Sequence, residues 1–449
     1  MTHRGLANLL RNRFTQVLPN ADFFRGAATI ASATAAAQFL TILAAPIIAR
    51  LYTPSAYGAY AVAAAVLALI VSVACVRYDL AIPLPSSDAE AASVLALCLA
   101  IVSGISFAVL LALVAAGPVI MDALGAESLG ASVWLLPVGI LGGGAFSGFV
   151  GWMVRTRAFR EIGASQLTQS GTAVGMQIGL GLLGTGAAGL LTAAILGSVA
   201  ATARLAWSTW RHGAAALRHF GGQDIRDAAV RYRRFPIFST PSIAMNMIGL
   251  QAPLVWIVAA FGPDTGGQFA LAQRIVALPV GVVAGAVGQV FFAEAARVAQ
   301  QQPTEVAALF GRTTRTLAIV AAPPFLVGAI ASPFLFPAIF GAAWTVSGIY
   351  VAILAPMYFL QFVTWPTGGV LDVLERQDLH LVRETGRLLL VGGVVVLATV
   401  TRLPAIESVI AVSLVGCVTN LMYGAISWRA VQRALAHPPA GAGGGTATA

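Results

Sequence analysis

The chain contains no lysine and very little charge for its length. Charged residues make up 10% of its 449 residues, 58% are hydrophobic, and all 26 basic residues are arginine. The mean hydropathy is +0.85. In soluble globular domains about a quarter of the residues are Asp, Glu, Lys or Arg. The shortage of charge therefore excludes a soluble globule and favours a helical protein that crosses a membrane many times.

Cysteine and histidine are also scarce, and motifs of catalytic or cofactor sites are absent. The three cysteines lie in or beside apolar runs, at positions 75, 98 and 417, which favours simple packing and gives no disulfide framework. The five histidines lie in polar segments or tails, without a second candidate metal ligand on the same helix face. We find no P-loop, dinucleotide fingerprint, catalytic triad or aromatic-interleaved basic patch. The sequence therefore predicts no enzyme activity, no metal or cofactor and no nucleic-acid partner.

Twelve apolar runs are long enough to cross about 30 Å of hydrocarbon as helices. They are continuous rather than alternating, which disfavours a transmembrane β-barrel. The fifth, sixth and eleventh runs are short or rich in glycine, so eleven or thirteen spans are alternatives. The predicted fold is an all-α polytopic membrane protein. The runs lie near Ala27–Ala49, Tyr57–Val76, Ala91–Ala116, Ala131–Val154, Ala164–Leu183, Ala187–Trp210, Pro236–Phe261, Gly267–Ala293, Thr314–Ile339, Ala343–Pro366, Gly386–Thr401 and Ala405–Trp428.

Arginine is distributed unequally between the two sides that these runs define. If both termini lie on one side, 23 of the 26 arginines fall in the loops and tails of that side. The opposite loops hold only Arg50 and Arg402, and Arg274 lies within an apolar run. Short cytoplasmic loops are enriched in arginine. We therefore predict a multi-pass membrane protein with both termini in the cytoplasm, where its arginines also attract anionic membrane lipid.

A long polar segment divides the runs into two sets of six. We expect a cytoplasmic arm over residues 1–26, an N-terminal lobe over 27–210, an inter-lobe loop over 211–235, a C-terminal lobe over 236–428 and a cytoplasmic tail over 429–449. The tail is rich in Ala and Gly, which predicts disorder. Within the loop, Ala214–Leu217 favours a short interfacial helix.

A short sequence similarity links the two lobes. Gly58–Ala63 opens the second run and Gly267–Ala272 opens the eighth, and a proline-containing turn precedes each. Both are second within their set of six. This position predicts parallel repeats about an axis along the membrane normal.

Several motifs resemble those of the Wzx-type polysaccharide flippases of the multidrug/oligosaccharidyl-lipid/polysaccharide (MOP) exporter superfamily. The similarity extends over about residues 25–430 and is greatest around Phe235–Arg274. The lipopolysaccharide and exopolysaccharide biosynthesis branch is the most similar. The motifs include Leu51–Gly58, Arg77–Pro85, Phe235–Ser242, Gln268–Arg274, Phe340–Trp344 and Leu371–Gln377.

The resemblance implies a transporter with two six-helix lobes around a central cavity. Such proteins lie in the bacterial inner membrane and move a polyprenyl-diphosphate-linked oligosaccharide from the cytoplasmic to the periplasmic leaflet by alternating access. The energy would come from a proton, from sodium or from the membrane potential, and contact with polysaccharide assembly proteins is a further expectation. A multidrug or small-molecule exporter of the same superfamily is the alternative. A membrane glycan polymerase or transferase is less favoured, because the predicted outer loops are short and carry few charges.

Arg274 is the first candidate for substrate binding. It lies about 10 Å below the outer end of its predicted helix, at 1.5 Å per residue. An arginine in hydrocarbon costs several kcal/mol unless it faces water or a partner. Its forked donors suit a diphosphate. The alternatives are that it extends to the membrane surface or pairs with Asp264.

Further charged candidates lie at the ends of the predicted spans. Arg50 either lines the outer mouth of the path or anchors its helix at the interface. Arg77 and Asp79 either form the inner mouth or cap and pair at the end of a helix, and Asp79 is also a candidate for binding a coupling ion. Residues two apart do not face each other on a helix.

Asp372 and Glu375 are the other candidates for binding a coupling proton or cation. If their segment is helical, Asp372 and Arg376 form a solvated pair at a spacing of four residues. Uncharged side chains within the spans can bind sugar hydroxyls or bridge helices. Of these, Asn246, Gln273 and Gln289 are the substrate-binding candidates. Others are Gln38, Gln177, Gln251, Gln361 and Asn420.

Overall fold

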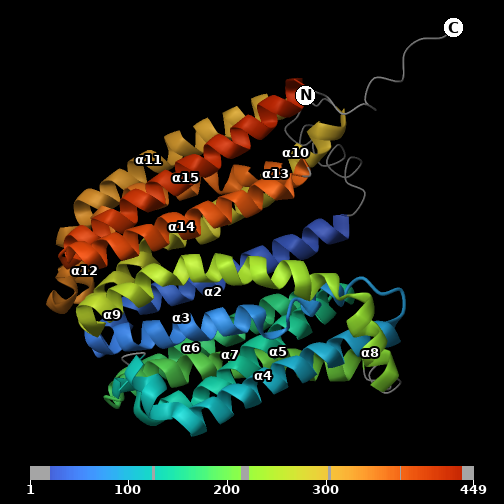
Figure 1. Ribbon diagram of the computed structural model, residues 1–449, viewed down its shortest axis with the longest axis horizontal. Helices are drawn as coiled ribbons and strands as arrows, with labels where there is room; N and C mark the ends of the chain where they lie inside the picture. Colours follow the sequence, from blue (N-terminus) through green and yellow to red (C-terminus); the bar gives the residue numbers. More distant parts are fainter. Residues whose placement is uncertain (1–20, 124–126, 214–221, 302–304, 375, 437–449) are drawn as a thin grey trace, which may run out of the picture.

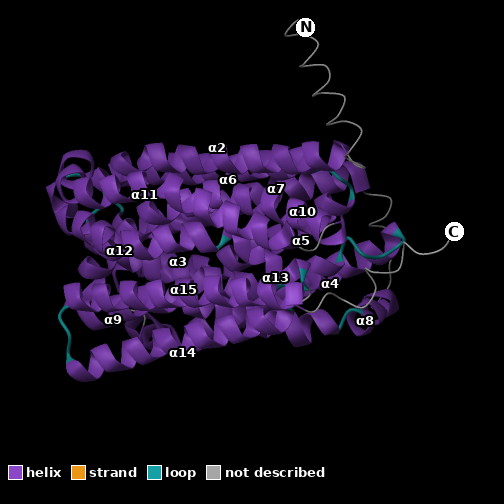
Figure 2. Ribbon diagram, turned by 90° about the horizontal axis from the view of Figure 1, so that it is seen from above, coloured by secondary structure: helices purple, strands orange, loops and turns teal. Residues whose placement is uncertain are grey.

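Two bundles of long helices lie side by side in the protein (Figure 1). A computed structural model describes residues 21–123, 127–213, 222–301, 305–374 and 376–436. All regular elements of these described residues are helical, and the long helices run nearly parallel, so the turns lie at the two ends of the molecule (Figure 2). The predicted all-α polytopic fold is confirmed.

The first lobe contains the helices that precede the polar segment. A Thr-Pro pair starts its second helix: the Ala56 N–H donates to Thr53 Oγ1 at 3.2 Å, and Pro54 occupies the first turn, where its missing N–H has no partner to lose. The lobe consists of α2 (Ala21–Leu51), α3 (Pro54–Ala74), η1 (Tyr78–Ala81), α4 (Asp88–Ala123), η2 (Glu127–Leu135), α5 (Leu136–Arg155), α6 (Phe159–Leu182) and α7 (Gly186–Gly213).

The second lobe begins after α8 (Gly222–Arg231). Its first long helix, α9 (Thr240–Pro279), folds back at Gly262, whose φ of 83° is readily available only to glycine, and so contains two predicted spans. The other elements are η4 (Phe235–Ser239), η5 (Val280–Ala284), α10 (Gly285–Gln301), α11 (Glu305–Phe340), η6 (Ala342–Trp344), α12 (Thr345–Thr364), η7 (Pro366–Gly369), α13 (Val370–Val373), α14 (Gln377–Thr401) and α15 (Ala405–Ala436).

Several predicted boundaries were wrong. Nine stretches of the described residues are long and apolar enough to cross a membrane, and one of them, Phe235–Ala299, contains the fold at Gly262. Helix α14 begins nine residues before its predicted span because its charged first turns pair within the protein. The segment predicted as the inter-lobe loop contains α8. The expected arm before residue 21, the interfacial helix Ala214–Leu217 and the tail after residue 436 lie outside the described residues.

The two ends of the molecule differ in arginine content. The arginine-rich end contains the described chain ends, Ala21 and Ala436, and most arginine-bearing connections. The arginine-poor end contains Gly262 and the turns beside Arg50 and Arg402. This asymmetry of the folded protein agrees with the distribution of arginine between the predicted loops.

The lobes share a hydrophobic core that, among the described residues, includes the contacts of the arginine-poor end. That core includes Tyr57 of the first lobe and Trp344 of the second, whose rings meet edge to face with centroids 5.7 Å apart. Toward the arginine-rich end each lobe has its own core, around Trp152 in the first and Phe310 in the second. The lobes are therefore closed against each other at the arginine-poor end.

Gly58 of α3 and Gly267 of α9 face each other in this closed region. A Cβ on Gly58 would lie 1.8 Å from the carbonyl oxygen of Pro263, and a Cβ on Gly267 would lie 1.8 Å from that of Pro54. The two copies of the repeated sequence thus meet in a reciprocal backbone contact, as two related halves do about a pseudo-two-fold axis.

Candidate functional site

A cavity of about 470 Å³ lies between the lobes. Helix α3 lines it from the first lobe, and α9, α12, α14 and α15 line it from the second. This volume falls in the range of small-ligand sites. The polar and charged side chains in its described lining are Tyr57, Tyr60, Gln251, Gln273, Arg274, Tyr358, Gln361, Arg387, Thr419 and Asn420.

Arg274 lines the cavity and reaches across the junction of the lobes. Its Nη1 donates to the hydroxyl of Tyr57 at 3.0 Å, and the two residues belong to different lobes. It forms no ion pair with any described residue, so the predicted alternative of a pair with Asp264 is wrong. A half-buried guanidinium without a carboxylate keeps most of its donors available to an anion.

Arg387 is a second cationic side chain of the cavity. It was missed in the sequence because it lies at the very start of its predicted span and was counted with the arginines of the preceding loop. On α14, its Nη2 donates to the Asn246 carbonyl at 2.7 Å and lies 3.4 Å from Glu384 Oε2. Its Nε is buried and has no partner among the described residues. Glu384 also contacts Arg383, which stacks 4.2 Å above the centre of the Tyr423 ring. This cluster carries a net positive charge beside the cavity.

The electrostatic character of the cavity follows from these two arginines. Among its described lining residues there is no aspartate or glutamate. The nearest carboxylate described here, Glu384, contacts both Arg383 and Arg387 and so neutralises only part of the cluster. The cavity can therefore bind an anion with charged fork donors while its amides and hydroxyls bind neutral polar groups.

The three amides selected from the sequence have different positions. Gln273 lines the cavity beside Tyr358. Asn246 contributes its backbone carbonyl to Arg387 rather than a side-chain contact. Gln289 is exposed on α10 and is not part of the described cavity lining.

Arg50 holds the lobes together instead of lining an open mouth. Its Nε and Nη2 donate to the carbonyls of Ile339 and Ala338, at 3.1 and 2.9 Å. These carbonyls lie in the last turn of α11 and lack helical partners. Beside this contact, Trp344 Nε1 donates to the Ala49 carbonyl at 2.7 Å. Arg50, Trp344 and Arg274 provide the hydrogen bonds between the described helices of the two lobes.

Arg77 and Asp79 lie at the arginine-rich end, in the turn after α3. Arg77 has a left-handed φ of 61°, which ends the helix and brings its Nη1 within 3.8 Å of Asp79 Oδ2. Burial raises the pKa of the Asp79 carboxyl, and the Arg77 guanidinium opposes this effect. Neither residue belongs to the described lining of the central cavity.

The expected pair between Asp372 and Arg376 was wrong. Helix α13 ends at Val373, so the two residues do not share a helix. Asp372 Oδ1 lies 3.2 Å from His380 Nε2, and Arg376 binds Asp378. Asp372 is exposed, outside the central cavity. Glu375 lies outside the described residues.

The sequence matches the family described as "Polysaccharide biosynthesis protein" over residues 47–348. The chain belongs to this family. The matched region contains the repeated glycines, the fold at Gly262 and the cavity residue Arg274. It ends before α14, so Arg387 lies beyond it. The family resemblance inferred from the motifs is confirmed.

A curated relative matches a smaller part of the chain. The teichuronic acid biosynthesis protein TuaB of Bacillus subtilis is 29% identical over 159 residues, which cover 35% of this chain and 32% of TuaB. The match therefore spans about a third of the relative's length.

Two solved structures have the same fold. An inward-facing multidrug resistance transporter of the MATE family, in the MOP superfamily, has a TM-score of 0.67 at 16% identity and covers 89% of this chain and 96% of that one. The lipid II flippase MurJ in an inward closed conformation has a TM-score of 0.68 at 12% identity, with coverages of 91% and 87%. The chain therefore shares the fold of these two proteins.

Proposed function

We propose that the protein is a flippase that moves a polyprenyl-diphosphate-linked oligosaccharide from the cytoplasmic to the periplasmic leaflet, for surface polysaccharide biosynthesis. The observation that carries this proposal is the cationic central cavity. Arg274 and Arg387 reach it from different helices, and its described lining offers no carboxylate to neutralise them. A diphosphate needs such charged donors to leave water, whereas sugar hydroxyls need amides and hydroxyls.

The orientation follows from the arginine-rich end, which we place in the cytoplasm by the positive-inside rule. The arginine-poor end then faces the periplasm, and the contacts of Arg50, Trp344 and Gly58 close the path on that side. The closed periplasmic end and the separate cores at the other end fit an inward-facing state. Alternating access then requires the Gly58 contact and the Arg274–Tyr57 hydrogen bond to separate.

Binding and opening are connected through Tyr57 in this proposal. Its hydroxyl accepts a hydrogen bond from Arg274, while its ring packs against Trp344 in the closed region. A diphosphate that takes the donors of Arg274 competes with Tyr57 for them. Substrate binding would thereby weaken one of the contacts that hold the lobes together in the inward-facing state. A ligand shifts the equilibrium between two states only if it interacts differently with each of them, and this competition provides such a difference.

An inside-negative membrane potential supplies a driving force of the required sign. Moving an anion outward is favoured by about 2.3 kcal/mol per charge at 100 mV. Coupling to a proton or sodium would instead use a buried carboxylate, for which Asp79 and Glu384 are the candidates among the described residues.

The second candidate function is export of a drug or another small molecule, which the likeness to the MATE fold favours. A transporter of organic cations would use carboxylates in its cavity. The described lining has arginines in their place. The cavity charge therefore favours an anionic substrate.

Deletion of the gene tests the proposal. We expect surface polysaccharide to be lost and the completed lipid-linked oligosaccharide to accumulate in the inner membrane, and the wild-type chain to reverse both effects. Normal polysaccharide without accumulation, in a strain with no second flippase, would favour the exporter. Loss of polysaccharide without any completed lipid-linked unit would place the protein in assembly and refute the flippase.

A further inference from the structure

A second polar cavity lies in the first lobe, away from the central one. It has a volume of about 500 Å³ and lies between the start of α2, the α5–α6 turn and the end of α7. Three apolar spans end near it, at Thr29, Arg155 and Arg211. Trp207 and Trp210 of α7 are more than half exposed at the same level. Exposed tryptophans beside arginines mark the membrane interface.

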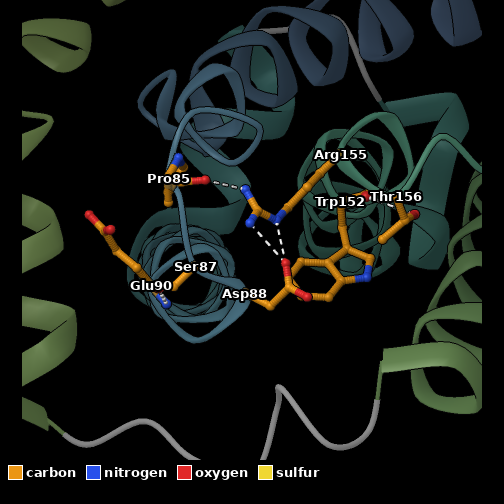
Figure 3. A network of polar contacts seen from close by, with 7 residues as sticks. All are labelled: Pro85, Ser87, Asp88, Glu90, Trp152, Arg155 and Thr156. Carbon is orange, nitrogen blue, oxygen red and sulfur yellow. Dashed lines mark hydrogen bonds and ion pairs between the residues drawn. The ribbon is translucent and has the colours of Figure 1, made fainter.

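Two arginines of this cavity have no partner among the described residues. Arg157 and Arg160 line it and form no hydrogen bond or ion pair with the described residues. No side chain caps the N-terminus of α6, which opens at the same place. The neighbouring Arg155 is already engaged by Asp88 Oδ1, at 2.8 and 2.9 Å, and by the Pro85 carbonyl (Figure 3).

A buried hydroxyl provides an independent sign of a ligand. Thr209 of α7 lines the cavity and is only 1% exposed, and its Oγ1 has no hydrogen-bond partner among the described residues. A buried hydroxyl without a partner costs about 1–3 kcal/mol. An acceptor that enters the cavity would satisfy this donor.

A second hollow continues from the first along α2 and α6. It has a volume of about 690 Å³ and shares Thr29, Arg160 and Glu161 with the first cavity. Farther into the span its lining is small and apolar, with Ala36 and Leu167 among its residues. The polar cavity thus opens into an apolar groove that follows the helices into the membrane.

We infer that these adjoining cavities bind one anionic phospholipid of the surrounding leaflet. Its phosphate lies between Arg157, Arg160 and the Thr209 hydroxyl, and one acyl chain follows the apolar groove. Glu161, the carboxylate in the lining, is paired with Arg204 at 3.2 Å, so the arginines keep an excess of positive charge. Basic pockets between helices at a membrane surface bind lipid phosphates in this way. The site is separate from the central cavity and does not depend on the proposed function.

Binding of one defined lipid to the purified full-length protein tests the inference. Native mass spectrometry with dioleoyl phosphatidylglycerol should reveal one bound lipid that dioleoyl phosphatidylcholine does not replace. Thr209→Val removes the hydroxyl at nearly constant volume and should weaken binding about tenfold. The double substitution Arg157→Gln with Arg160→Gln should weaken it about thirtyfold, since each arginine contributes about 1 kcal/mol near a lipid surface.

The matched control is Arg312→Gln with Arg315→Gln, which removes two exposed arginines of α11 at the same end of the protein. This variant should bind the lipid as the wild type does. If the control variant lost as much lipid binding as the double variant, or if Thr209→Val lost none, general surface charge would explain the binding. Either result would overturn the inference. Displacement of the lipid by equimolar soluble glycerol phosphate would also overturn it, because the groove would then contribute nothing. Arg157 and Arg160 are exposed, so their variant tests the site even if Thr209→Val fails to fold.

Discussion

At the scale of single residues, the unpaired charges of the membrane region carry the function we propose. Among the described residues, Arg274 donates a hydrogen bond to the Tyr57 hydroxyl. Arg387 and Arg383 share the carboxylate of Glu384. Ionisable side chains within a membrane usually pair with one another, bind backbone carbonyls or face a water-filled cavity. These two are neutralised partly or not at all, as a site for an anion requires.

Replacing Arg274 by glutamine should reduce export at least about tenfold, because a hydrogen bond to a charged group contributes about 1.5–3 kcal/mol. Arg274→Lys should keep part of the activity, since it retains the charge and loses the fork. The measurement is the amount of surface polysaccharide relative to the amount of lipid-linked oligosaccharide that accumulates in the inner membrane. Arg312→Gln, on an exposed side chain, is the control. Normal export by Arg274→Gln at equal protein levels would refute the diphosphate site.

Asp79 should make stability depend on pH. Burial raises the pKa of its carboxyl above the ordinary value of 3.8, so the folded protein holds a proton that the unfolded chain has lost. Stability therefore falls as the pH rises above 3.8 and through the raised pKa. In detergent, the Tm of the wild type should fall over this window, and Asp79→Asn should lessen the fall. Superimposable pH profiles of the two proteins would contradict the prediction.

At the scale of helices, the contact between α3 and α9 forms the seal of the closed end. The backbones approach so closely at Gly58 and Gly267 that no side chain fits between them. Two helices that meet through glycine pack tightly and form few side-chain interactions at that point, so few side chains have to separate there when the helices part. This contact is therefore suited to opening and closing.

Gly58→Ala should prevent this seal from forming. The new methyl group would meet the backbone of Pro263, which cannot rotate away as a side chain can. Overpacking of this kind costs about 1–3 kcal/mol or more and should shift the protein away from the closed state by about tenfold or more. We expect a loss of export with a normal amount of folded protein. Gly175→Ala is the control, since open space surrounds that position. Equal activities of both variants would show that the seal has no role.

Helix α14 shows why charges mislead the assignment of spans. Its first turns contain Arg383, Glu384 and Arg387, which a hydropathy window assigns to a loop. In the structure these charges pair with one another and with Tyr423 and the Asn246 carbonyl, so the helix continues. Of these partners, Tyr423 and Asn246 lie on other helices. No local signal in the sequence could reveal them.

At the scale of the whole molecule, the arginine asymmetry predicts which end faces the cytoplasm. We expect a membrane-impermeant maleimide, added to intact cells, to label Arg402→Cys and not Arg312→Cys, in a chain whose three natural cysteines are replaced. Both positions are exposed, and they lie at opposite ends. Permeabilised cells should label both variants. The reverse pattern would invert the proposed direction of transport.

The sequence by itself determined the helical crossings, their division into two sets, the asymmetry of charge and the family. These properties depend on local composition and on spacing along the chain, because hydrocarbon imposes one length and one polarity on every span. Arg274 was also recognisable, as an isolated charge in an apolar run. The repeated glycines were visible as a similarity between the lobes, without any indication that they touch.

Only the tertiary structure decided which residues come together. It placed Arg387 in the same cavity as Arg274, assigned Arg50 to the junction of the lobes and placed Arg157 and Thr209 in the lining of one cavity. These relations depend on contacts between segments far apart in the chain, and such contacts leave no periodic trace in one sequence. Packing also determined which positive charges are not fully neutralised, and those charges define both proposed binding sites.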